Sequence, residues 1–340
     1  MCLREAQIQD SCAAGWEGRG KMVLFTGGGL AQSPAVRARI MLMGIGAAAV
    51  VGGGVWWWSA RHAPQLGQAA LVQTEAILAL GPRPPGSAAL QAVRGCLRDQ
   101  LKAAGWVSVG QPFERSTTLG MVKFENLRAR IAGGDADPWQ RPVKGLLCAH
   151  MDSKLLKHEV FLGADDAASA CGAMLEIARV LATESPHQAK QMELVFFDGE
   201  EALEESMTAF DGLYGSRHYA AAWPATAAKP HFGVLLDMIG HKDLSIRLPS
   251  DTPEALREAV LAAAKKEGAS KHFDVGPGSI TDDHTPLNHA GIPTVDVIGD
   301  FSNRRWWHTS ADSRSNLSAD SLEISIRVTL DVLDGLLKGP

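Results

Sequence analysis

The chain has 340 residues, of which 46% are hydrophobic and 21% are charged. This length and composition suit one large folded domain, and they exclude a disordered chain or a collagen-like fibre. The formal net charge of −5 provides no overall basic field to attract a polyanion, so we expect no nucleic-acid partner. The five cysteines form no CxxC pair, so we expect any metal to be bound by histidine and carboxylate side chains.

The N-terminal part of the chain contains a long apolar run. Residues 40–58 include no charged residue and no histidine, and Arg39 and Arg61 flank them. As a helix this run would be roughly 28 Å long, close to the hydrocarbon thickness of a bilayer. We therefore predict a transmembrane signal anchor at 40–58, with residues 1–39 in the cytoplasm and without a predicted fold. The remainder would lie in a periplasm or a Golgi lumen, and a cleaved signal peptide is the alternative prediction.

We predict that residues 65–340 form one domain of the α/β class. Apolar runs typical of strands buried on both faces occur at 143–149, 192–197, 231–238 and 294–298. Helical patterns occur at 66–80, 88–104, 166–183, 213–222, 252–266 and 319–337. This order predicts a single three-layer α/β/α domain around a mostly parallel, twisted sheet, preceded by the one transmembrane helix.

Polar residues directly follow several of these strands. Ligands of doubly wound sheets bind at the carboxyl ends of the strands, so these residues are candidates for a functional site. They are His150, Asp152, Asp165, Asp166, Asp198, Glu200, Glu201, Asp237 and His308. Each has an ordinary structural explanation when taken alone. Two histidines and several acids at one sheet edge would nevertheless be costly to desolvate without a cation, and this donor set suits an open catalytic Zn²⁺ site.

Glu200 and Glu201 are adjacent in this set. Neighbours in an extended segment point to opposite sides, so one can bind the metal while the other faces the substrate as a proton shuttle. The pattern alone leaves open which residue has which role. We also expect desolvation to raise the pKa of one member of the acidic cluster toward the operating pH.

The same residues carry a family resemblance. Their order and spacing are similar to those of the zinc exopeptidase superfamily of aminopeptidases. Within it the chain most resembles the glutaminyl-peptide cyclotransferases (glutaminyl cyclases), including the membrane-anchored branch with its N-terminal hydrophobic segment. The motifs that carry the resemblance cover nearly all of residues 71–337: GPRPPGS at 81–87, HMDSK at 150–154, DGEEAL at 198–203, LYGSRHYA at 213–220, LLDMIG at 235–240, DDHTPL at 282–287 and WHTSAD at 307–312.

The resemblance implies a zinc-dependent acyltransferase. Residues 65–340 would be a catalytic domain that converts the N-terminal glutamine of a peptide or protein to pyroglutamate and releases ammonia. By the same resemblance, Asp166, Glu201 and His308 would bind one Zn²⁺. Glu200 would be the general base and acid.

The resemblance also implies roles for residues around the metal. Asp237 and Asp282 would form an acidic pair near the substrate amine, and Trp307 would line the pocket for the glutamine side chain. His150 matches a metal ligand of the two-zinc aminopeptidases. We therefore regard His150 and Asp152 as candidates either for a second metal or for a supporting role beside the first.

The chain departs from the family at two places. The family has a tryptophan shortly after the paired glutamates, whereas this chain has none there, so we expect that wall to be missing or rebuilt from Met207, Phe210 or Phe301. Cys171 matches one half of a disulfide of the animal enzymes. The nearest candidate partner, Cys148, is predicted to point to the other face of its strand, so we expect two buried thiols.

Two other functions remain open. A zinc aminopeptidase would use the same ligands, hold a second zinc at His150 and Asp237, and hydrolyse a peptide bond. A membrane-tethered peptide-binding protein without activity is the other alternative, and the complete set of ligands and proton shuttle argues against it. In the main interpretation, the partners are peptides that begin with glutamine, and the chain is a monomer attached to a membrane.

Overall fold

The structure is a computed structural model that describes residues 66–134, 137–223, 228–302 and 304–338. The predicted N-terminal segment 1–39 and transmembrane anchor 40–58 lie outside the described residues. Within the described ranges, no helix has the length and apolar character that crossing a membrane requires.

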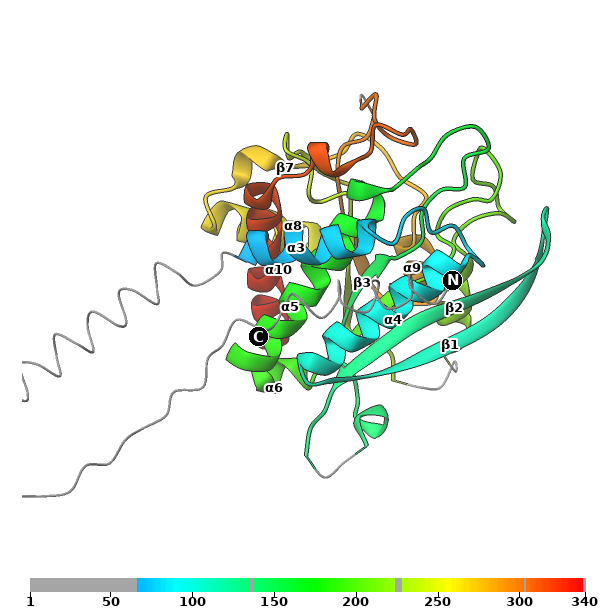
Figure 1. The fold of residues 1–340 in the computed structure, drawn as a ribbon. Coiled ribbons are helices and arrows are strands. Elements are labelled where there is room, and N and C mark those ends of the chain that lie inside the picture. The colour runs from blue at the N-terminus through cyan, green and yellow to red at the C-terminus, as the bar shows by residue number, and fades with distance from the viewer. Residues whose placement is uncertain (1–65, 135–136, 224–227, 303, 339–340) are drawn as a thin grey trace, which may run out of the picture. The chain divides into compact units, whose positions relative to one another are not determined.

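A six-stranded sheet runs through the middle of the fold in the order β1-β2-β4-β3-β5-β8 (Figure 1). β3 pairs in parallel with β4 and β5, and β5 pairs in parallel with β8. β1 and β2 form an antiparallel hairpin, and β2 pairs antiparallel with β4. The prediction of a mostly parallel central sheet is therefore confirmed. Its strands are β1 (Trp106–Thr117), β2 (Gly120–Ile131), β3 (Gly145–His150), β4 (Met192–Phe197), β5 (Phe232–Asp237) and β8 (Thr294–Ile298).

The β1–β2 hairpin is missing from the sequence-based prediction. β1 contains Gly110 and Pro112, two residue types that are depleted in strand interiors, and most of its positions are partly or fully exposed. Among the described strands, β1 pairs with β2 only and forms one edge of the sheet. An edge strand tolerates proline, because the missing backbone N–H can lie on the side that has no neighbouring strand. The edge position of β1 therefore explains why its sequence contains glycine, proline and exposed residues, and why it lacks the apolar pattern from which a strand would have been predicted.

Helices cover both faces of the sheet, as predicted. α3, α4, α5, α8 and α10 contribute to the larger core on one face, and α7 and α9 pack on the other. The helices are α3 (Leu66–Leu78), α4 (Ala88–Ala103), α5 (Ala170–Glu184), α6 (Pro186–Ala189), α7 (Tyr214–Ala221), α8 (Glu254–Lys266), α9 (His284–His289) and α10 (Ala319–Lys338).

Several shorter elements complete the described chain. β6 (Ile246–Leu248) and β7 (Phe273–Val275) pair in parallel as a separate two-stranded sheet. Short 3₁₀ turns are η1 (Pro138–Gln140), η3 (Ser270–His272) and η4 (Arg314–Asn316). An irregular turn, η2 (Ala164–Ser169), in which Asp166 and Ala167 have non-helical φ and ψ angles, leads directly into α5.

Neighbouring residues of the central strands face opposite cores. Leu147 of β3 belongs to the larger core, whereas Leu146 and Cys148 belong to the smaller one. Every residue of β3, β4, β5 and β8 is buried, which explains their continuous apolar sequences. Cys148 and Cys171 lie in different cores and are both free thiols, so the prediction of two buried thiols is confirmed.

Candidate active site

A cavity of about 710 Å³ is lined by segments that follow the parallel strands. Its volume is typical of a small-molecule binding site. The family resemblance implies places in the site for nine residues, and seven of them line this cavity: Asp166, Glu200, Glu201, Asp237, Asp282, Trp307 and His308. The other two, His150 and Asp152, are fully buried and do not line the cavity.

Parallel strand order brings these residues together. His150 and Asp237 are the last residues of β3 and β5. Glu201 follows the end of β4, and His308 lies in the segment after β8. Asp166 lies in η2, at the start of the crossover that follows β3. The carboxyl ends of parallel strands meet at one sheet edge, which is why distant sequence positions share one site.

Asp166, Glu201 and His308 form a cluster that fits a metal ion. Nε2 of His308 lies 3.5 Å from Oδ2 of Asp166 and 3.2 Å from Oε1 of Glu201. Their candidate ligand atoms all lie within 4.8 Å of one another. Oε1 of Glu201 is buried, and Nε2 of His308 approaches it without hydrogen-bond geometry. One imidazole nitrogen and two carboxylates form a donor set that zinc uses in catalytic sites.

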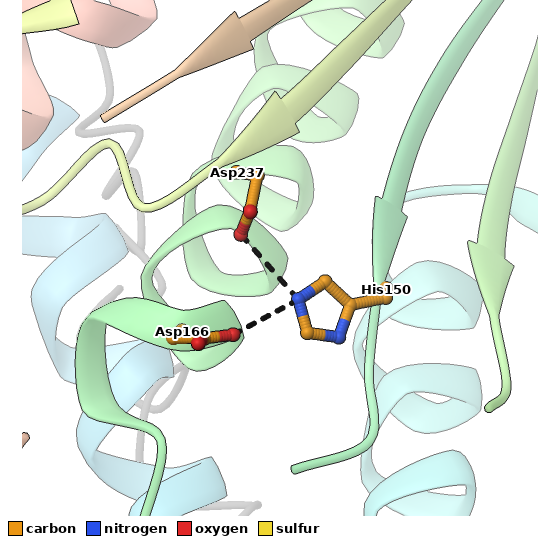
Figure 2. Close-up of side chains that lie close together, drawn as sticks. All are labelled: His150, Asp166 and Asp237. Carbon is orange, nitrogen blue, oxygen red and sulfur yellow. Dashed lines mark ion pairs between the residues drawn. The ribbon is translucent and has the colours of Figure 1, made fainter. Parts of the chain in front are cut away.

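His150, Asp166 and Asp237 form a second cluster beside the first (Figure 2). Nε2 of His150 lies 3.1 Å from Oδ1 of Asp166 and 3.4 Å from Oδ1 of Asp237. Asp166 belongs to both clusters and directs one carboxylate oxygen toward each histidine. The arrangement can hold one cation in the first cluster, or two with Asp166 between them.

A glycine lies shortly before the acids of the site in two segments, Gly163 before Asp166 and Gly199 before Glu200. Gly163 and Gly199 have φ angles of +54° and +73°, in the left-handed region that favours glycine. A Cβ at Gly163 would lie 2.0 Å from the carbonyl oxygen of Asp166, and one at Gly199 would lie 2.6 Å from Cε1 of Phe124. A larger residue at either position would displace the backbone that carries Asp166 or Glu200.

Burial controls the protonation of the acids in the cavity. It raises the pKa of Glu200 well above the usual glutamate value. Burial, followed by the charge of Asp296, does the same to the pKa of Asp282. Burial also acts to raise the pKa of Asp166, but the hydrogen bonds from both neighbouring histidines outweigh it and lower that pKa. Burial therefore shifts the pKa of Glu200 and Asp282 in the direction expected from the sequence.

Asp152 and Lys154 support the segment that carries the paired glutamates. The two carboxylate oxygens of Asp152 accept the backbone N–H groups of Glu200 at 3.2 Å and Glu201 at 3.3 Å. Nζ of Lys154 lies 3.6 Å from Oε2 of Glu201 and donates to the carbonyl of Ala202 at 3.0 Å. Asp152 therefore supports the backbone of the paired glutamates. Lys154, which belongs to the HMDSK motif and had no predicted role, contacts the side chain of Glu201 and the carbonyl that follows it.

Arg83 is a residue whose contribution sequence reasoning missed. It lies in the GPRPPGS turn, and its side chain is fully buried. Its guanidinium donates to the carbonyl of Met151 at 2.9 Å, to that of Gly163 at 2.8 Å and to that of Leu162. Arg83 therefore joins the segment after β3 to the turn that precedes Asp166. The sequence does contain a signal for this role, because Arg83 is the one charged residue in the GPRPPGS turn.

A further buried group lies behind Asp282. His284 and Asp296 are fully buried, and Nδ1 of His284 lies 3.3 Å from Oδ2 of Asp296. Together with Asp282 they form another set whose side chains could hold a cation. Sequence reasoning did not single out Asp296, although an acid inside the apolar run 294–298 was a usable signal.

Aromatic side chains form one wall of the cavity. The rings of Trp307 and His308 stack with centroids 3.9 Å apart, and Phe301 lies 4.7 Å from Trp307. Met207 and Phe301 both line the cavity, as two of the three expected replacements for the missing tryptophan. The third expectation was wrong, because Phe210 is 88% exposed and does not line the cavity. Phe210 lies in the short turn between Thr208 and Asp211, which form an isolated antiparallel β-bridge.

The chain is similar to proteins of known families. Residues 126–333 match peptidase family M28. Over 296 residues the chain is 30% identical to a glutaminyl-peptide cyclotransferase of Bos taurus, covering 75% of this chain and 76% of that protein. The structure is similar to that of an Acidobacteriales bacterium glutaminyl cyclase, with a TM-score of 0.71 and 28% identity over 81% of this chain and 96% of that chain.

A third similar protein is a Zn-dependent exopeptidase from Parabacteroides distasonis. Its TM-score is 0.68 at 26% identity, over 78% of this chain and 97% of that chain. The match to the family covers more than half of this chain, and the bovine relative is aligned over more than two thirds of both chains. The chain therefore belongs to peptidase family M28 and, within that family, to the glutaminyl-peptide cyclotransferases.

Proposed function

We propose that this chain is a glutaminyl-peptide cyclotransferase that converts the N-terminal glutamine of peptides or proteins to pyroglutamate and releases ammonia. The observation that carries the proposal is a single cavity lined both by the ligand set of Asp166, Glu201 and His308 and by the separate acids Glu200 and Asp282. The cyclotransferase and glutaminyl cyclase relatives support it.

Asp166, Glu201 and His308 would hold one Zn²⁺, for which their nitrogen and oxygen donors are suited. When bound there, zinc would polarise the γ-carboxamide carbonyl of the substrate and stabilise the charge that develops on its oxygen. The buried Oε1 of Glu201 supports this assignment, because the nearby imidazole of His308 does not meet it with hydrogen-bond geometry and a cation between the two would satisfy both.

The acids of the cavity would act on the α-amine of the substrate. The carboxylates of Asp237 and Asp282 would accept hydrogen bonds from this amine and turn its nitrogen toward the carboxamide carbon (Cδ) of the same residue. The bond between the α-nitrogen and Cδ then closes the five-membered lactam, and the bond from Cδ to the amide nitrogen Nε2 breaks. High effective molarity favours this ring closure once the side chain is folded back.

Glu200 would carry the proton between the two nitrogens. The attacking amine loses a proton to Glu200, and Glu200 returns it to the departing amide nitrogen, which leaves as ammonia. Burial raises the pKa of Glu200 above the usual glutamate value, so this carboxyl group holds a proton more readily than an exposed glutamate does. Trp307, Phe301 and Met207 would form apolar walls around the glutamine side chain and exclude water.

The test incubates the full-length zinc-loaded chain with a peptide that begins with glutamine and, separately, with one that begins with leucine. We expect mass spectrometry to detect the loss of one ammonia from the glutamine peptide and no change in the leucine peptide. Metal analysis should find about one zinc per chain.

The Glu200→Gln variant should lower kcat by about 10²–10⁴-fold, because it removes the proton carrier while zinc remains bound. Glu204→Gln is the matched control, since Glu204 lies on the same segment, pairs with Lys157 and does not line the cavity. Equal activities of the two variants would contradict the role of Glu200.

A zinc aminopeptidase is the second candidate function. The cluster of His150, Asp166 and Asp237 favours it, because a second cation there would give a two-metal site that shares Asp166. The exopeptidase relative is consistent with this alternative. Release of free leucine, with about two zinc ions per chain, would identify this activity.

The proposed cellular location is based on the sequence alone. We propose that residues 40–58 anchor the chain in a membrane and that residues 65–340 act on its extracytoplasmic side, as a monomer. Extraction of cell membranes at alkaline pH checks this: an anchored chain stays in the pellet, and a chain released into the supernatant contradicts the anchor. Treatment of intact cells or vesicles with protease then reports the side on which the domain lies.

A further inference from the structure

A second cavity, of about 490 Å³, adjoins the active-site cavity. Ser279, Ile280 and Phe301 line both cavities, so the two lie side by side along these residues. We refer to the second cavity as the side groove. Its other lining residues are Arg247, Gly276, Pro277, Gly278, Gly299, Asp300 and Ser302.

One stretch of chain runs from the side groove to the catalytic acids. Residues 276–278 line the side groove, Ser279 and Ile280 line both cavities, and Thr281 and Asp282 line the active-site cavity. In the proposed function, Asp282 binds the substrate α-amine. The second residue of a bound peptide is only a few bonds from that amine, because it is joined to the carbonyl carbon of the N-terminal glutamine. It therefore lies near the stretch that leads into the side groove.

This stretch has free main-chain donors. Among the described residues, the backbone N–H groups of Ser279, Ile280 and Thr281 donate no hydrogen bond. Ser279 and Thr281 are exposed, and Ile280 is half-buried. An extended peptide can pair with such unpaired backbone groups, and main-chain pairing tolerates many side chains.

The charges of the side groove are already paired. Nη1 of Arg247 lies 2.7 Å from Asp274, and its Nε lies 3.5 Å from Asp300. The remaining walls are glycines, Pro277, Ile280, Phe301 and two serines. The side groove therefore suits a main chain with small or apolar side chains, and it offers no unpaired charge to select a charged residue.

We propose that the side groove binds the residues that follow the N-terminal glutamine of a peptide substrate, in an extended conformation. This inference rests on the proposed function and specifies its substrate class. Peptides with several residues after the glutamine gain binding energy that glutamine amide lacks. Such energy from parts of a substrate remote from the reacting bond raises kcat/KM for the longer substrate.

Gly278→Leu is the variant that tests this inference. A Cβ at Gly278 meets no heavy atom within 4 Å, and its φ angle lies outside the left-handed region, so the variant can fold without strain. The added side chain would occupy part of the side groove. Gly335→Leu is the matched control, because Gly335 is an exposed residue of α10 where a Cβ also meets nothing within 4 Å.

The experiment measures kcat/KM of the full-length chain for glutamine amide and for a pentapeptide of glutamine followed by four small, uncharged residues. We expect Gly278→Leu to lower the pentapeptide value by about tenfold while the glutamine amide value and both Gly335→Leu values stay unchanged. An unchanged pentapeptide value, or an equal fall for both substrates, would overturn the inference.

Failure of the proposed function gives a different result. If the unmodified chain cyclises neither substrate, the cyclase assignment is wrong, and calorimetry with the same pentapeptide then tests the side groove. Weaker binding to Gly278→Leu than to the unmodified chain would support the side groove as a peptide site. Equal binding to both chains, or no binding to the unmodified chain, would overturn it.

Discussion

At the scale of single residues, buried charges hold the candidate site in place. Arg83 donates to three carbonyls on two segments around the site and has no direct carboxylate partner among the described residues. Asp312 accepts the backbone N–H groups of Asp165 at 2.9 Å and Asp166 at 3.1 Å. Neither residue lines the cavity, yet both determine where Asp166 lies.

We predict that Arg83→Met strongly destabilises the chain. The carbonyls of Met151, Leu162 and Gly163 would lose a buried donor, and leaving buried acceptors unsatisfied costs about 1–3 kcal/mol of unfolding free energy for each group, so we expect a total loss of about 3–5 kcal/mol. Urea denaturation measures the loss. Arg115→Met is the control, because the contacts of Arg115 are exposed and we expect its effect to stay within about 0.5 kcal/mol. Similar effects of the two substitutions would contradict the role of Arg83.

We predict that zinc affinity depends on pH through His308. Burial acts to lower its pKa, but the neighbouring carboxylates of Asp166 and Glu201 outweigh burial and raise the pKa of His308 to about 9 in the metal-free protein. Zinc binds the neutral imidazole, so binding displaces this proton below that pH. Affinity should therefore rise by about tenfold per pH unit for each released proton and level off above pH 9. Competition with a chelator of known pH dependence measures this rise, and a constant affinity from pH 7 to 9 contradicts it.

At the scale of elements, close helix packing supports the turn that carries Asp166. α5 follows η2 directly and packs against α3. A Cβ at Gly172 of α5 would lie 2.2 Å from Oγ1 of Thr74 and 2.6 Å from the carbonyl oxygen of Ala70, both in α3. The absence of a side chain at Gly172 therefore permits this close approach of the two helices.

We predict that Gly172→Val lowers the free energy of unfolding by about 2–3 kcal/mol or more, because the new side chain meets backbone atoms of α3. Gly95→Ala in α4 is the contrasting variant. A Cβ at Gly95 meets nothing within 4 Å, so we expect this change to raise stability by about 0.5–1 kcal/mol. Thermal and urea unfolding measure both, and a neutral Gly172→Val would show that α3 and α5 do not pack this closely.

At the scale of the whole molecule, the candidate metal ligands come from three separate segments of the fold. Asp166 follows β3, Glu201 follows β4 and His308 follows β8. A cation bound by all three would link these segments across the edge of the sheet. An ion that binds the folded chain and not the unfolded chain stabilises the fold by mass action.

We predict that removing the metal with a chelator lowers Tm by several degrees and that added zinc restores it. Differential scanning calorimetry measures the change. In Asp166→Asn the loss of a charged ligand should abolish the response, so that Tm becomes the same with and without chelator. A wild-type Tm that does not respond to the chelator would contradict a structural contribution of the metal.

Much of the architecture was predictable from local sequence patterns. The four parallel strands and most of the helices lie close to their predicted ranges, because strands buried on both faces have continuous apolar runs and amphipathic helices have regular periodicity. The β1–β2 hairpin was not predicted, because a partly exposed edge strand containing Gly110 and Pro112 lacks either pattern.

By itself, the sequence determined the fold class, the strand ends that carry polar residues and the motifs that identify the family. Tertiary structure alone decided which of those residues meet. It put Asp166 between two histidines, brought Arg83 and Asp296 to the site and left Phe210 outside it. The physical reason is that strand patterns and turn glycines act over a few residues. Distances between side chains on different crossovers, in contrast, depend on the packing of the entire sheet and its helices.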